Sequence, residues 1–98
     1  MTTNVITAIL TAYCACRSCC GPNAAGITAS GTRPIAGRTV AIPRAYPLGS
    51  RVVIGGHTYV GEDRTARRFN GRIDIFFRTH AEARRFGIRT NTVTVIIP

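Results

Sequence analysis

Six short segments of the chain carry the hydrophobic pattern of β-strands. They are rich in β-branched and aromatic residues and are bounded by Gly, Pro, Asn, Asp or Arg. Within the fifth segment, Asp74 and Phe76 point to the face opposite Ile73 and Ile75, because successive side chains of a strand alternate. The predicted strands are Val5–Tyr13, Thr39–Ile42, Arg51–Ile54, His57–Asp63, Arg72–Phe77 and Thr90–Ile97.

Turn and cap residues connect these strands. The Gly55–Gly56 pair predicts a hairpin turn between the third and fourth strands. After the fifth strand, Thr79 and Glu82 have the spacing of a capping box, and Gly87 supplies a C-terminal stop. We therefore expect a two-turn helix, with His80 in its first turn and at the surface.

The rest of the chain is loop. Residues 14–38 contain many turn-forming glycines and prolines, and residues 64–71 form a polar loop. A loop as long as the first is usually functional in a compact domain. Six strands and one short helix, with no linker or repeat, predict a single mainly all-β domain over residues 1–98. A small closed barrel would leave no exposed strand edges.

Composition adds a strongly basic surface. All 13 basic residues are Arg, against four acidic residues, and the formal net charge is +9. Such a charge attracts polyanions, including nucleic acid, anionic lipid and acidic cell-wall polymers. The pairs Arg67–Arg68 and Arg84–Arg85 lack interleaved aromatic residues, and no helix-turn-helix or zinc-finger spacing is present, so no nucleic-acid partner is expected. No apolar run approaches the roughly 20 residues of a membrane-spanning helix.

The four carboxylates divide into two groups. Glu82 is explained by the helix cap, and Glu62 is expected to face solvent because it alternates with Asp63 along a strand. Asp63 and Asp74 remain as a candidate catalytic pair, since glycosidases commonly use two carboxyl groups. General-acid catalysis near neutral pH requires a raised pKa, and Arg64 or Arg72 nearby would oppose that rise.

Four cysteines lie within seven residues: Cys14, Cys16, Cys19 and Cys20. The sequence leaves local disulfides, free thiols and a zinc site open. A nucleophilic cysteine is less favoured, because His57 and His80 are distant in the sequence.

Several motifs together resemble the 3D domain, which is named for three aspartates. The first is Tyr13-Cys14-Ala15-Cys16-Arg17-Ser18-Cys19-Cys20-Gly21, followed by Gly26-Ile27-Thr28-Ala29-Ser30-Gly31, Gly37-Arg38-Thr39-Val40-Ala41 and Pro47-Leu48-Gly49-Ser50. Glu62-Asp63, Gly71-Arg72-Ile73-Asp74-Ile75-Phe76-Phe77, His80-Ala81-Glu82-Ala83 and Phe86-Gly87 complete the series. The resemblance extends from about Thr11 to Val95. The segment Thr28–Gly31 and the Asp63-Arg64 step are also similar to the rare lipoprotein A type of barrel.

This resemblance implies a six-stranded double-psi β-barrel that cleaves peptidoglycan glycan strands without a cofactor, as in the membrane-bound lytic transglycosylase A group. Asp74 matches the aspartate that serves as general acid and then general base, and Asp63 matches a second family aspartate. Thr28 and Ser30 either line the groove or form loop turns, and Tyr13 either stacks on a sugar or belongs to the core.

The chain departs from the family pattern at Ile42, which stands in place of the first aspartate. Arg64-Thr65-Ala66 replaces a glycine pair, and Asn70-Gly71 inverts the usual order. The alternative hypothesis is therefore a non-catalytic cell-wall or phage-virion module on the same barrel. Residues 1–10 lack the basic segment and long apolar stretch of a signal peptide, so we expect delivery to the wall by lysis, within a virion or through a separate leader.

Overall fold

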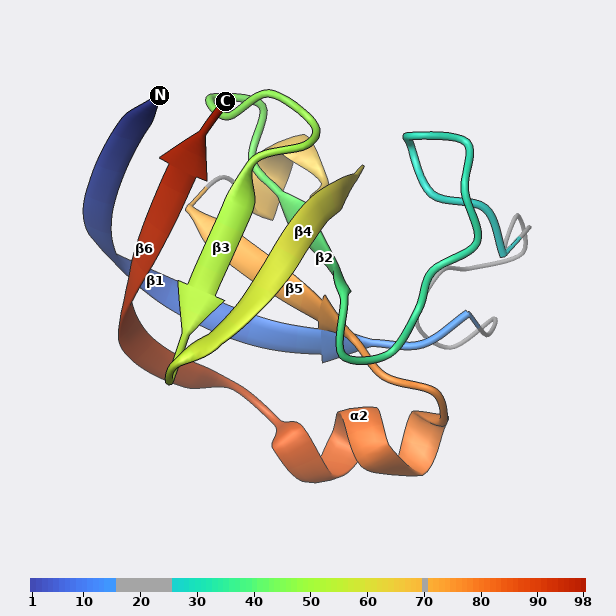
Figure 1. Ribbon diagram of the computed structural model, residues 1–98. Coiled ribbons are helices and arrows are strands. Elements are labelled where there is room, and N and C mark those ends of the chain that lie inside the picture. Colours follow the sequence, from blue (N-terminus) through green and yellow to red (C-terminus); the bar gives the residue numbers. More distant parts are fainter. Residues whose placement is uncertain (16–25, 70) are drawn as a thin grey trace.

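The computed structural model describes residues 1–15, 26–69 and 71–98. Six strands close into a barrel in the order β1-β5-β2-β4-β3-β6 (Figure 1). Their bounds are β1 Thr2–Tyr13, β2 Thr39–Ile42, β3 Arg51–Ile54, β4 His57–Arg64, β5 Arg72–Phe76 and β6 Arg89–Ile97. The predicted closed, mainly β fold with one short helix is confirmed.

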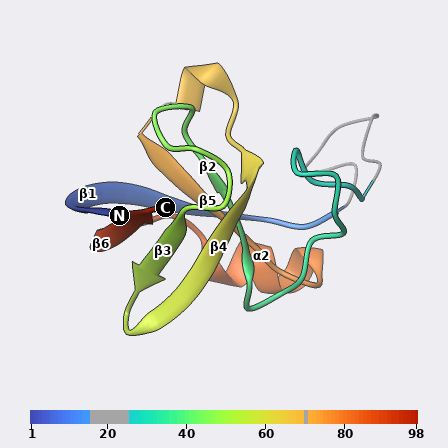
Figure 2. The same cartoon turned by 45° about the horizontal axis from the view of Figure 1, so that its top comes forward.

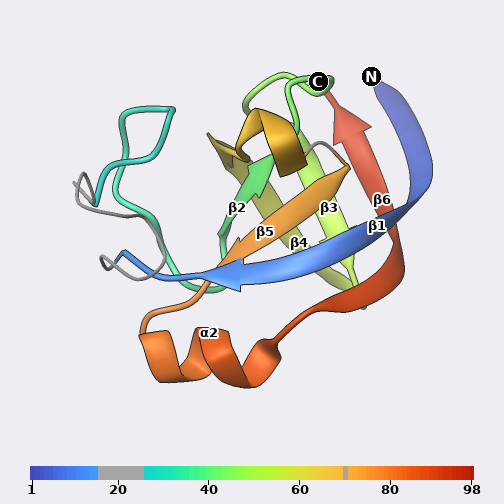
Figure 3. The same ribbon diagram turned by 180° about the vertical axis from the view of Figure 1, so that it is seen from behind.

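Two parallel strand pairs distinguish this barrel from a simple meander. β1 pairs in parallel with β5, and β2 pairs in parallel with β4. The remaining neighbours, β2–β5, β3–β4, β3–β6 and β1–β6, are antiparallel. Figure 3 shows β1 and β5 running side by side across the back of the barrel. The first and last strands also pair, so the two chain ends lie close together.

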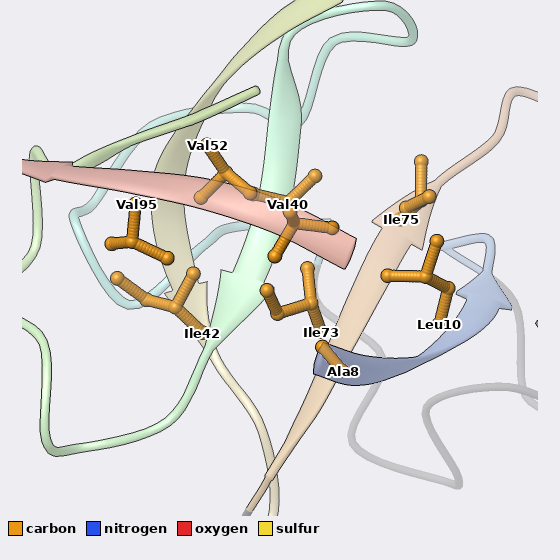
Figure 4. Packing of buried hydrophobic residues seen from close by; sticks show 9 residues of the cluster. Ala8, Leu10, Val40, Ile42, Val52, Ile73, Ile75 and Val95 are labelled. Carbon is orange, nitrogen blue, oxygen red and sulfur yellow. The ribbon is translucent and has the colours of Figure 1, made fainter. Parts of the chain in front are cut away.

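The barrel interior is filled by aliphatic side chains from every strand but β4, because alternate positions of each strand face inward (Figure 4). The fully enclosed members include Leu10, Val40, Ile42 and Ile73. Gly61 of β4 makes room for this packing: a Cβ at that position would lie 2.5 Å from Ile42 Cδ1. Burial of these apolar side chains is the main stabilising contribution of the fold.

Turn and cap predictions are also confirmed. Gly55 and Gly56 connect β3 to β4 with φ angles of 57° and 79°, the positive values that a tight type I′ hairpin turn requires. Helix α2, His80–Phe86, is capped by the Thr79 hydroxyl, which accepts from the Glu82 amide. The Glu82 carboxylate accepts from that same hydroxyl rather than reaching the Thr79 backbone amide.

The loop after β4 is more ordered than its polar sequence suggests. A 3₁₀ helix, Arg67–Phe69, projects from the barrel beside the loop that joins β2 to β3 (Figure 2). Helix α2 lies against the opposite end, below β1 in Figure 1. Within the described ranges, neither helical segment has the length and apolar character needed to cross a bilayer.

Candidate active site on the outer face of the barrel

The two candidate aspartates lie in one row across four strands. In the strand register, Asp63 of β4 is opposite Ala41 of β2, Ala41 is opposite Asp74 of β5, and Asp74 is opposite Thr11 of β1. Residues paired across neighbouring strands share a face of the sheet. Asp63 and Asp74 therefore project from the same outer face, two strands apart, with backbones about 10 Å from each other.

A cavity of about 460 Å³ lies over this row. Ala41 separates the two aspartates and leaves space above the sheet because its side chain is a single methyl group. The polar lining comes from the strands, from the loops that follow β2 and β4, and from the 3₁₀ turn. Its lining residues are Thr11, Tyr13, Ala41, Arg44, Asp63, Arg64, Thr65, Ala66, Arg68, Phe69, Arg72 and Asp74.

Asp74 has the properties of a general acid. Burial raises its pKa from 3.8 to about 6; the hydrogen bond from Thr11 opposes the rise, the Asp63 charge adds to it, and the Arg72 charge opposes it. Thr11 Oγ1 donates to Asp74 Oδ1 over 2.9 Å. Oδ2 accepts no hydrogen bond from the described residues and is not buried, so it is open to the cavity.

Asp63 is held by three donors. The Tyr13 hydroxyl donates to Oδ2 over 3.0 Å, and the amides of Ala29 and Arg64 donate to Oδ1 over 3.0 and 2.9 Å. Both oxygens of this carboxyl are thus fixed by donors. The two aspartates therefore occupy different environments within one cavity.

Tyr13 joins the site to a small second core. Its ring is 8% exposed and meets Phe76 edge-on, with centroids 5.4 Å apart, next to Ala41. The ring is thus mostly packed, while its hydroxyl orients Asp63. The packed ring fits the core part of the sequence alternative, and stacking of Tyr13 on a sugar stays a prediction.

Thr28 and Ser30 lie in the loop beside the cavity rather than in its wall. Thr28 is buried and its hydroxyl is 2.9 Å from that of Thr32. The Ser30 hydroxyl and amide both donate to the Glu62 carbonyl. These contacts hold the loop against β4, and the neighbouring Ala29 amide reaches Asp63 from the same loop.

Arg64 does not oppose the rise in the pKa of Asp74. Its guanidinium Nη1 donates to the carbonyls of Pro43 and Tyr46 over 2.9 and 2.6 Å, which ties it to the β2–β3 loop. Arg72, by contrast, does lower that pKa, but burial outweighs it. The expectation that a nearby arginine opposes the rise in the pKa of Asp74 thus holds for Arg72 and not for Arg64.

The expectation that Glu62 faces solvent is wrong. Its side chain is 8% exposed, accepts from Thr39 Oγ1 over 2.8 Å and forms a 3.0 Å ion pair with Arg38. The cause is a bulge: Val40 pairs with Gly61, but the next residue, Ala41, pairs with Asp63. The extra residue in β4 breaks the alternation, so Glu62 lies on the same face as Asp63, beneath the loop.

The cysteines can be placed only in part. Cys14 is buried, and its Sγ lies 3.7 Å from Nδ1 of His80, whose side chain reaches it from an exposed position at the start of α2. Cys16, Cys19 and Cys20 lie outside the described residues. Among residues 1–15, 26–69 and 71–98, no group of three or more His, Cys, Asp or Glu is arranged to hold a metal.

Sequence reasoning did not identify Thr11, Arg44 or Phe69 as part of the site. Thr11 sits 63 residues before Asp74 in the chain and meets it only through the parallel β1–β5 pairing. Alternation offers a partial signal, because Thr11 and Tyr13 share a face. The 3₁₀ turn that presents Phe69 has no comparable signal in its polar sequence.

The geometry defines a closed six-stranded barrel with a paired-aspartate cavity on its outer face. No protein-family model matches the chain. Over 97 residues, 97% of its length, the chain is 33% identical to the Bacillus subtilis (strain 168) protein named "Putative cell wall shaping protein YabE". The chain spans about a quarter of that relative, 24% of its length.

Proposed function

We propose that the chain is a cell-wall barrel domain of the 3D, double-psi type that cleaves peptidoglycan glycan strands as a lytic transglycosylase. The cell-wall role is supported by similarity to a protein named for cell wall shaping. The two parallel strand pairs support the double-psi class. The observation that carries the activity is the single cavity shared by Asp63 and Asp74, with the pKa of Asp74 raised to about 6.

In this mechanism Asp74 acts twice. As an acid, it gives its proton to the glycosidic oxygen while the bond to the anomeric carbon breaks. As the resulting carboxylate, it takes the proton of the sugar's own 6-hydroxyl, whose oxygen attacks the anomeric carbon and closes a 1,6-anhydro ring. Asp74 is then protonated again and no water is consumed. One acid suffices because the substrate carries its own nucleophile.

Asp63 serves a second role in the proposal. Its three hydrogen bonds fix in place the carboxylate whose charge acts on Asp74. Such a charge stabilises the positive charge that develops at the anomeric carbon as the bond breaks. Tyr13 and the Ala29 amide act as positioning groups for this carboxylate, and through this amide the loop that contains Thr28 and Ser30 supports the site.

The test is cleavage of purified sacculi, with products analysed by mass spectrometry. We expect anhydro-ended muropeptides from the parent chain and at least a hundredfold less from Asp74→Asn. Glu82→Gln is the matched control, because it removes a carboxylate at the helix cap, away from the cavity. Equal release by Asp74→Asn would overturn the assignment, as would products with reducing ends.

A binding module without activity is the alternative that the sequence raised at Ile42, and the structure weakens that reason for it. This residue, at the position of the family's missing aspartate, is 0% exposed inside the barrel. Its side chain belongs to the core rather than to the cavity, so its identity removes no carboxylate from the wall beside Asp74. Retention on sacculi with no product release by the parent chain would favour this candidate.

A further inference from the structure

A series of arginines extends from the Asp74 cavity into the next depression on the surface. Arg68 and Arg72 line the cavity, Arg67 lines the second depression, and Arg44 lines both. The second depression has a volume of about 360 Å³ and shares Thr65 and Ala66 with the first, so the two are continuous. The groove thus has carboxylates and guanidinium groups in its first part and guanidinium groups without carboxylates in its second.

These guanidinium groups are not neutralised by acidic side chains of the described residues. The one ion pair in that part of the chain joins Arg38 to Glu62, outside the groove. Asp63 and Asp74 line the same cavity but form no ion pair with Arg44, Arg68 or Arg72. Positive charges gathered in a concave site attract an anionic ligand.

Phe69 orders two of the arginines. The guanidinium of Arg68 lies 4.8 Å from the centre of its ring, and that of Arg72 lies 4.5 Å from it. Stacking on an aromatic face restricts the planar guanidinium while leaving its edge donors available. Those donors match the two oxygens of a carboxylate.

The arrangement of charge selects the ligand. A nucleic acid carries a phosphate on every nucleotide and would place some of them against Asp63 and Asp74. A chain of neutral sugars with an anion at intervals fits better, because the sugar can meet Asp74 while the anion meets the arginines. This reasoning rests on the proposed function, in which a glycan occupies the cavity.

We propose that Arg44, Arg68 and Arg72, the arginine wall, bind a carboxylate carried by the glycan strand next to the bond that is cleaved. Peptidoglycan offers this group in two forms: the carboxylates of the peptide stem where a stem is attached, and the lactyl carboxylate of the sugar where it is not, because the stem is joined through that lactyl carboxyl as an amide. The wall makes the groove selective for strands that carry carboxylates over neutral glycans of the same length.

Binding is measured in the Asp74→Asn background, so that strands are not cut. The test variant is Arg44→Gln with Arg68→Gln, which spares Arg72 because this residue lies two positions before the Asp74→Asn change on β5. The control is Arg33→Gln with Arg84→Gln, two exposed arginines outside the groove. The probes are glycan strands freed of phosphate polymers by hydrofluoric acid, the same strands after amidase removal of stems, and neutral chitin oligosaccharides.

We expect the test variant to bind the stem-bearing strands about tenfold more weakly than the control variant and to bind chitin oligosaccharides equally well. A loss that disappears after amidase treatment assigns the stem carboxylates alone, and a loss that persists shows that the wall also accepts the lactyl carboxylate that this treatment frees. Equal affinity of both variants for all strands would overturn the proposal.

The binding experiment and the cleavage experiment can fail independently, so the arginine wall and the proposed activity are tested separately. Product release by the parent chain with no arginine effect would reject the arginine wall and leave the activity in place. An arginine effect with no product release would reject the transglycosylase activity and retain carboxylate binding.

Discussion

Asp74 links the proposed chemistry to pH through its burial. The carboxyl is placed on the outer face of the sheet, yet the cavity walls remove enough water to raise its pKa to about 6. A raised carboxyl pKa means that the folded protein binds a proton more tightly than the unfolded chain does. The stability due to Asp74 is therefore fully present below pH 3.8 and is lost as the pH rises through about 6.

Replacing Asp74 with Asn should remove this dependence. Between pH 4 and pH 8 we expect the variant to gain stability relative to the parent chain, by at most about 3 kcal/mol, because Asn does not ionise. The measurement is the difference between the two free energies of unfolding, from denaturant titrations across this range. A difference that stays constant with pH would show that Asp74 titrates in the folded protein as it does when unfolded.

The hydrogen bond from Thr11 lowers the pKa of the Asp74 carboxyl. This hydrogen bond favours the charged form, so Thr11→Val should raise the pKa of Asp74 further. We expect the fall in cleavage rate on the alkaline side to move to higher pH, since the acid stays protonated longer. Thr7→Val is the matched control, because Thr7 lies on the same face of β1 but outside the cavity. An unchanged pH profile for Thr11→Val would contradict this role.

Single residues also show what the sequence could reveal about the site. Asp63 and Asp74 were recognisable because so few acids occur in the chain and because both match family positions. Thr11 was not, since its contact with Asp74 depends on a parallel pairing between the first and fifth strands. Distant contacts of this kind depend on topology, which local patterns do not encode.

At the level of elements, local patterns predicted the strands well. Alternation and turn-forming residues are properties of neighbours in sequence, so β2 and β3 were predicted with their observed ends. The bulge in β4 was missed because it is a property of the pairing between β2 and β4. That single extra residue places Glu62 under the loop and, through the Glu62 carbonyl, anchors Ser30 beside Asp63.

Gly61 sets the spacing between β4 and the core. In Gly61→Ala the new Cβ would lie 2.5 Å from Ile42 Cδ1 and 3.1 Å from two further Ile42 carbons. Because Ile42 is fully buried, we expect the variant to lose about 1–3 kcal/mol in the free energy of unfolding.

A double-mutant cycle checks this explanation. Ile42→Val removes Cδ1, so its combination with Gly61→Ala should cost less than the sum of the two single changes. Additive losses, measured by denaturant unfolding, would show that the conflict lies elsewhere.

For the whole molecule, the barrel separates the residues that stabilise the fold from those of the candidate site. The interior is apolar and carries the stability, while the acidic row and the arginines all project from the outside. Because the aspartates come from β4 and β5 and Tyr13 comes from β1, the site requires the neighbouring strand order β1-β5-β2-β4. The 3₁₀ turn after β4 then completes the cavity wall.

The net charge of +9 adds a long-range attraction to polyanions, and this attraction is independent of the proposed catalytic step. Attraction between exposed charges is screened over a Debye length that falls from about 14 Å in 0.05 M salt to about 4 Å in 0.5 M salt. Retention of the protein on sacculi should therefore fall several-fold across this range, and it should fall equally for the parent chain and for Asp74→Asn. The measurement is a pull-down quantified at each salt concentration. If retention is instead insensitive to salt, contacts inside the groove rather than the basic surface hold the protein on the wall. The loss of retention in Arg44→Gln with Arg68→Gln should then be as large at 0.5 M salt as at 0.05 M salt.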